Sequence, residues 1–140
     1  MLAYVPPIDD YQFLLTDVLQ FDAEMRELGK DVDTSLALTI LEEAGRMCAD
    51  RLQPINREGD EEGSRLVDGI VQTPAGFAQA YRAFTEGGWP SLSADPAYGG
   101  QGLPFILQLW FDEMMSATNL SFGLFPGLTR GACEAIGGVT

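Results

Sequence analysis

The sequence contains no histidine and only two cysteines, Cys48 and Cys133. Without histidine, Ser-His and Cys-His nucleophilic sites are excluded, and the commonest metal ligand is missing. Two isolated cysteines are too few for a disulfide framework or a zinc site. Because Cys48 lies in an apolar helical pattern, we expect it to be a buried free thiol. The residues therefore predict no self-contained catalytic site and no metal site.

Positive charge is also scarce, with 8 Lys and Arg against 21 Asp and Glu and a formal net charge of −13. A field of this sign repels phosphate backbones and anionic lipid surfaces, which disfavours binding to nucleic acid or to a membrane surface. The first residues, MLAYVPPIDDYQF, carry no basic region and no long apolar stretch. We therefore expect no signal peptide, no membrane span and a cytoplasmic location.

The composition is that of a folded domain, 46% hydrophobic and 10% aromatic over 140 residues, which is enough for one core. Apolar residues at spacings of three and four, with Pro and Gly at the ends of the segments, indicate helices and no convincing sheet. The predicted helices are a first short one capped by Asp9 or Asp10, then 22–29, 35–53, 74–86, 104–118 and a last one from Pro126 or Gly127.

Three of these helices are supported by local signals. The 35–53 helix can be capped by Thr34 or Ser35, and Leu36, Ile40, Ala44, Met47, Cys48 and Leu52 form its apolar stripe. Thr73-Pro74 resembles a helix start. The 104–118 helix is apolar nearly all round, so we expect it to be central, with Trp110 and Phe111 inside.

The segments between the helices are predicted to be loops. NREGDEEGSRL is polar and glycine-rich, so Asp60, Glu61 and Glu62 are expected to be solvated rather than an acid/base pair. Asp68-Gly69 indicates a turn with a short extended piece. Gly99, Gly100 and Gly102 could cradle a phosphate, but a phosphate-binding loop needs a preceding strand and a following Lys-Ser/Thr. A structural turn is the better interpretation.

These observations predict an all-α fold of about six helices. Residues 1–33 would form an N-terminal extension with short helices. Residues 34–140 would form a helical domain that is incomplete at its C-terminal end.

The sequence contains the segments LQPINREGDEEG and VDGIVQTPAGFAQAYRAF, and GW followed by DPAYGGQGLP and a helix with Asp112-Glu113. These segments resemble the acyl-CoA dehydrogenase family. Tyr4, Pro6-Pro7 and Phe13 are similar to the extra N-terminal stretch of the larger bacterial members, such as the methylthiopropanoyl-CoA dehydrogenase-like group. The resemblance runs from about residue 4 to the end of the chain and identifies it with the family's N-terminal helical domain.

The resemblance implies an enzyme that desaturates an acyl-CoA thioester at the α,β position with FAD and passes electrons to an acceptor. It also implies a homo-oligomer, and a glutamate base and flavin-binding domain that lie outside these residues. The chain alone would then hold no catalytic residue and no cofactor.

The segment FPGLTRGAC matches the family region that borders the acyl chain. On that match, Leu128, Thr129, Ala132 and Cys133 are expected to line the acyl pocket. The alternative is that Leu128 and Ala132 are ordinary core residues one helical turn apart. Arg130, a rare cation in this chain, would by itself be expected to be solvated.

A second function from a different class also fits the sequence. The chain could be a stand-alone helical interaction module that kept the fold without the chemistry. A large exposed apolar patch would favour the enzyme segment, because monomers rarely expose one.

Overall fold

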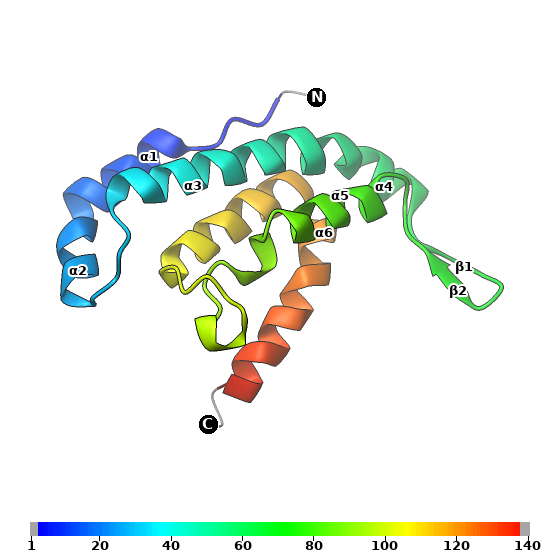
Figure 1. Cartoon of the computed structure of the whole chain (residues 1–140). Helices are drawn as coiled ribbons and strands as arrows, with labels where there is room; N and C mark the ends of the chain where they lie inside the picture. Colours follow the sequence, from blue (N-terminus) through cyan, green and yellow to red (C-terminus); the bar gives the residue numbers. More distant parts are fainter. Residues whose placement is uncertain (1–2, 138–140) are drawn as a thin grey trace.

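The computed structural model describes residues 3–137, which form six α-helices and one short hairpin (Figure 1). The elements are α1 (Ile8–Phe13), α2 (Phe21–Glu27), α3 (Thr34–Met47), α4 (Asn56–Glu62), β1 (Arg65–Val67), β2 (Ile70–Gln72), α5 (Phe77–Glu86) and α6 (Phe105–Gly137). Single π-helical turns, Leu14–Val18 and Cys48–Leu52, prolong α1 and α3, and 3₁₀ turns lie at Gln53–Ile55, Trp89–Ser91 and Pro96–Tyr98. The predicted all-α class with about six helices is confirmed.

Helix α3 forms one side of the molecule, and the first part of α6 packs beneath it (Figure 1). The N-cap is Asp33, not Thr34 or Ser35, because the Asp33 carboxylate accepts a hydrogen bond from the Leu36 N–H at 2.8 Å. The buried face contains Ala37, Leu41, Ala44, Met47, Cys48 and Leu52. Leu36 was predicted on this stripe but is 45% exposed.

The first part of α6 supplies much of the core, as predicted. Phe111 is fully buried and Trp110 is 7% exposed. The Trp110 ring stacks on Tyr11 with centroids 4.6 Å apart, and Phe111 packs against Phe84 and Trp89. The helix is central but is not covered all round, because Phe105 and Leu109 are 56% and 52% exposed.

Three predicted boundaries are wrong for identifiable reasons. The supposed loop 56–66 contains α4, in which Gly59 lies so close to Phe77 that a Cβ there would be 2.5 Å from the ring. Helix α5 begins at Phe77, not at Thr73-Pro74, because Gly76 adopts a left-handed φ of +83° just before it. Helix α1 begins at Ile8 and holds Asp9 and Asp10 in its first turn rather than as caps.

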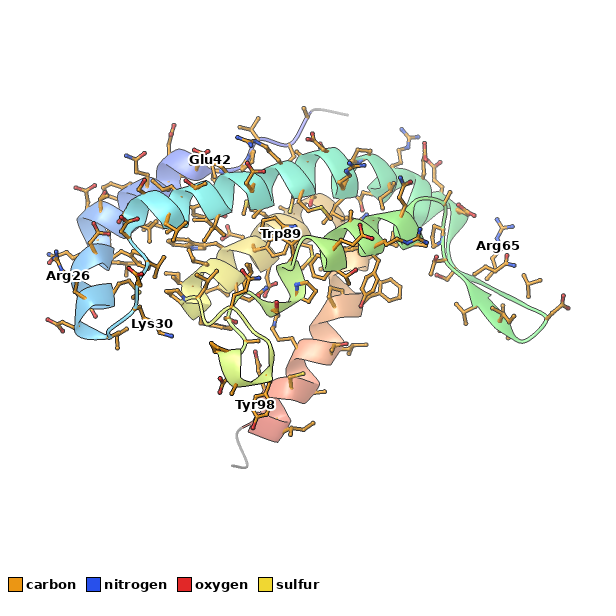
Figure 2. The ribbon with its side chains drawn as sticks, viewed as in Figure 1. Arg26, Lys30, Glu42, Arg65, Trp89 and Tyr98 are labelled. Atoms are coloured by element: carbon orange, nitrogen blue, oxygen red, sulfur yellow. The ribbon has the colours of Figure 1, made fainter. Side chains whose placement is uncertain are left out.

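The turn at Asp68-Gly69 is confirmed and joins β1 to β2 as an antiparallel hairpin in which Leu66 faces Val71. Both turn residues have positive φ, +50° and +78°, as the tight turns of two-residue hairpins require. All six strand residues are exposed, and the hairpin projects from the helices with Arg65 on it (Figure 2).

Across residues 3–137, we find no helix that combines the length and the apolar character needed to cross a membrane.

Candidate functional site

Helix α6 consists of two arms that meet at Asn119, and the bend is visible in Figure 1. Asn119 has non-helical angles, φ −160° and ψ 84°. Its side-chain carbonyl accepts from the Phe122 N–H at 3.0 Å, and its amide donates to the Leu52 carbonyl at 3.1 Å. Asn119 therefore caps the second arm, residues 120–137, and ties the bend to the end of the α3 segment.

The second arm begins earlier than predicted. We expected a helix from Pro126 or Gly127, but the arm is already helical from Leu120, and Pro126 lies buried inside it. Proline has no N–H and normally disrupts a helix interior. Here the helix continues through Pro126, and Asn119 is the residue of α6 that departs from helical angles.

All four residues predicted for the acyl pocket are exposed on the second arm. Leu128 is 79% exposed, and Thr129, Ala132 and Cys133 also belong to the exposed class. At 3.6 residues per turn, Leu128 and Ala132 lie on one face, and Thr129 and Cys133 lie on the adjoining stripe. The alternative that Leu128 and Ala132 are core residues does not hold for the described residues 3–137.

The same face carries two further exposed apolar residues. Ile136, which the sequence places on this helix with Leu128 and Ala132, is 72% exposed, and Leu124, one turn before Leu128, is 64% exposed. We call the residues Leu124, Leu128, Ala132 and Ile136 the apolar face of the second arm. Leu124 was not predicted, although its spacing of four from Leu128 was the signal that could have identified it.

An aromatic groove of about 320 Å³ adjoins this arm and lies between it and α5. Its lining residues are Thr73, Phe77, Ala78, Tyr81, Phe122 and Phe125. Phe125 is 48% exposed and meets Phe77 edge-on at 6.5 Å between ring centroids. The sequence predicted a helix here but not the groove between α5 and α6.

We had expected Arg130 to be solvated, but it forms an ion pair. Its guanidinium lies 2.7 Å from one carboxylate oxygen of Asp112 and 2.8 Å from the other. Asp112 also accepts from the Gln108 amide at 3.0 Å. The two charged side chains are 31% and 20% exposed, so the first and second arms are joined by a half-buried ion pair.

The titratable groups with strongly shifted pKa values lie in the core, away from the apolar face. Burial raises the pKa of the Cys48 thiol to about 12, and burial with the nearby Cys48 and Glu113 raises that of Tyr4 to about 12. The pKa of Tyr11 is raised as well, chiefly by burial. These groups stay neutral near pH 7 and are not suited to acid/base chemistry there. The prediction that Cys48 is a buried free thiol is confirmed.

The glycine loop is a closed structural turn. The N–H groups of Gly100, Gln101 and Gly102 donate to the carbonyls of Asp95, Ser91 and Ala94 at 2.9–3.0 Å. A Cβ at Gly100 would lie 2.0 Å from the Ala94 oxygen. The amides that a phosphate would need are thus already bonded within the loop, whose outer residue Tyr98 is exposed (Figure 2).

Over the part of the chain that the structure describes, no three His, Cys, Asp or Glu side chains come together in a way that could hold a metal ion.

Comparison with known proteins relates the chain to two dehydrogenases, whereas no protein-family model matches it. It is 35% identical over 136 residues to 3-methylmercaptopropionyl-CoA dehydrogenase of Ruegeria pomeroyi, across 96% of the chain. It is 34% identical over 94 residues to butyryl-CoA dehydrogenase of Syntrophomonas wolfei, across 65% of the chain. The chain spans 23% and 15% of the lengths of these relatives. It therefore belongs to the acyl-CoA dehydrogenase family and corresponds to a helical segment of such a protein.

Proposed function

We propose that the chain is the N-terminal helical domain of an FAD-dependent acyl-CoA dehydrogenase and that its second α6 arm forms part of the wall of the acyl cleft. The observation that carries this proposal is the apolar face of that arm. Leu124, Leu128 and Ile136 are 64–79% exposed on a face that nothing within residues 3–137 covers. An apolar surface of this kind fits an aliphatic acyl group or the neighbouring domain that would close over it.

The described residues do not fit a flavin by themselves. The glycine loop has no free amides for a pyrophosphate, and the formal charge of −13 opposes binding of a phosphate-bearing ligand. The flavin, the base and the electron acceptor would therefore belong to the remainder of a full-length enzyme. The isolated chain should be inactive, and a yellow, flavin-loaded protein purified from this chain alone would contradict that part of the proposal.

The test uses the Ruegeria pomeroyi relative with its matching segment replaced by this chain. Substituting Ala132→Phe places a large ring on the apolar face. If this face lines the cleft, kcat/KM should fall more for long acyl-CoA thioesters than for short ones, because the ring fills space that only a long acyl chain reaches. Steady-state kinetics over a series of chain lengths measure the effect.

Ala117→Phe is the matched control, since Ala117 is exposed on the first arm and receives the same ring. We expect it to change long and short substrates alike. Equal losses across chain lengths in Ala132→Phe would show that Ala132 is a packing position. Flavin absorbance and gel filtration show that each chimera is folded before its kinetics are compared.

A further inference from the structure

The second arm of α6 is intrinsically a poor helix. It contains Gly123, Gly127 and Gly131 at intervals of four, with Pro126 between them. Glycine and proline are the least favourable residues in a helix interior. Close packing does not account for all of these glycines, because a Cβ at Gly127 or at Gly131 would meet nothing within 4 Å. The orientation of the arm must therefore depend on its contacts with the rest of the fold.

Those contacts are concentrated in the N-terminal half of the arm. Asn119 bonds Phe122 at the bend, and Phe122 and Pro126 are buried. From residue 128 to 137, every described residue is exposed except Arg130, which is half-buried. Arg130 reaches back 18 positions to Asp112 on the first arm.

The Asp112 carboxylate is held on both sides. The buried Gln108 amide donates to it from the preceding turn, and the Arg130 guanidinium reaches both of its oxygens. Both contacts come from one guanidinium nitrogen, Nη1, which lies 2.8 Å and 2.7 Å from the two carboxylate oxygens of Asp112, and charge-assisted contacts of this kind are stronger than neutral hydrogen bonds. Glu134 is a weaker second partner of Arg130, at 3.7 Å and 60% exposed.

We propose that the Asp112–Arg130 pair is a latch that sets the orientation of the second arm relative to the first. The helix is interrupted at Asn119, whose φ and ψ are not helical, so the ion pair is the contact that would fix the angle between the two arms beyond the bend. If the proposed function is correct, the latch also determines where Leu128 and Ala132 stand in the acyl cleft. Asp112 and Arg130 would then be positioning residues for substrate specificity, without touching the reacting atoms.

The latch can be tested on the chain itself by pulsed EPR distance measurement. In a Cys133→Ser background, spin labels on Thr39→Cys and Ile136→Cys report the separation of α3 from the end of the second arm. Both positions are exposed, and Cys48 is buried and unlabelled. The parent should give one narrow distance peak, and Arg130→Gln should lose it and give a broad distribution.

Two further variants make the result specific. Asp112→Asn, alone or combined with Arg130→Gln, should broaden the distribution as much as Arg130→Gln does, since residues that act as one pair are not additive. Glu134→Gln, which removes the outer partner of Arg130, should keep the narrow peak. Far-UV circular dichroism confirms that each variant has kept the helical fold.

A narrow peak in Arg130→Gln, or equal broadening in Glu134→Gln, would overturn the latch. The same variants in the Ruegeria chimera test the link to function through the ratio of kcat/KM for long and short thioesters. If the distance distribution responds and this ratio does not, the latch stands and the acyl-wall proposal fails. If neither responds, the latch itself is wrong.

Discussion

The burial of Trp110 makes it a direct probe of the core. Its indole is 7% exposed and stacks on Tyr11, which ties the N-terminal segment to α6. Trp110→Ala should lower the free energy of unfolding by about 3–5 kcal/mol, the usual range for deleting a large buried aromatic side chain. Urea denaturation measures this loss. A variant as stable as the parent would mean that the first arm does not pack on α1 as described.

The two cysteines should differ sharply in reactivity. Burial raises the pKa of the Cys48 thiol to about 12, whereas Cys133 is exposed. Near pH 8 the Cys133 thiol of the folded chain should therefore react with a disulfide reagent. The Cys48 thiol should react only after unfolding, because an unperturbed thiol has a pKa of about 8.5. Because the folded pKa of Cys48 is the higher one, its contribution to stability is present below the unfolded pKa and is lost as the pH rises. Two rapidly reacting thiols in the native chain would contradict the burial of Cys48.

At the scale of residues, the sequence predicted the kind of surface or core in which a residue lies better than it predicted which residues contact each other. The exposed positions of Leu128, Thr129, Ala132 and Cys133 agree with a lining role without testing it. The ion pair of Arg130 could not be foreseen, because its partner lies 18 positions away across a bend that no local pattern announced. Periodicity describes one helix at a time and does not give the angle between two.

Among the elements, two glycines offer a matched pair of Gly→Ala substitutions in helices. A Cβ at Gly131 in the second arm meets nothing within 4 Å, whereas a Cβ at Gly45 in α3 would lie 2.4 Å from Pro6. Gly131→Ala should stabilise the chain by up to about 1 kcal/mol through helix propensity. Gly45→Ala should destabilise it by about 1–3 kcal/mol, because it overpacks the contact with the N-terminal segment.

Thermal denaturation followed by circular dichroism measures both changes. Shifts of the melting temperature in opposite directions are expected. If Gly131→Ala lowers the melting temperature, the space around Gly131 is not open as described. If Gly45→Ala is neutral, Pro6 does not pack against α3.

Element by element, the predicted helices are all present, their ends are partly wrong, and one further helix, α4, was not predicted. Helix α4 was missed because Asn56–Glu62 is a polar sequence whose helix depends on Gly59 packing against Phe77. Helix α5 begins later than Thr73-Pro74 because Gly76 turns the chain with a positive φ. For α4 a tertiary contact outweighed the polar, glycine-rich composition, and for α5 a single glycine outweighed the capping signal.

For the whole molecule, the all-α class followed from periodicity, and membership of the acyl-CoA dehydrogenase family followed from the loop and helix segments that carry the resemblance. Neither the periodicity nor the resemblance could supply the bend in α6 (Figure 1). Beyond that bend, the apolar face of the second arm is exposed. That face has a function only if another domain or a substrate covers it. The proposed function therefore depends on what occupies the surface of Leu124, Leu128 and Ala132.

Photoaffinity labelling tests that occupancy most directly. The Ruegeria chimera is incubated with an acyl-CoA whose acyl chain ends in a photoreactive group, then irradiated and digested for peptide mass spectrometry. If the second arm lines the acyl cleft, we expect adducts on it, at or beside Leu124, Leu128 and Ala132. These adducts should disappear when excess unmodified thioester competes. Competed adducts confined to the remainder of the chimera, with none on residues 120–137, would contradict the proposed function.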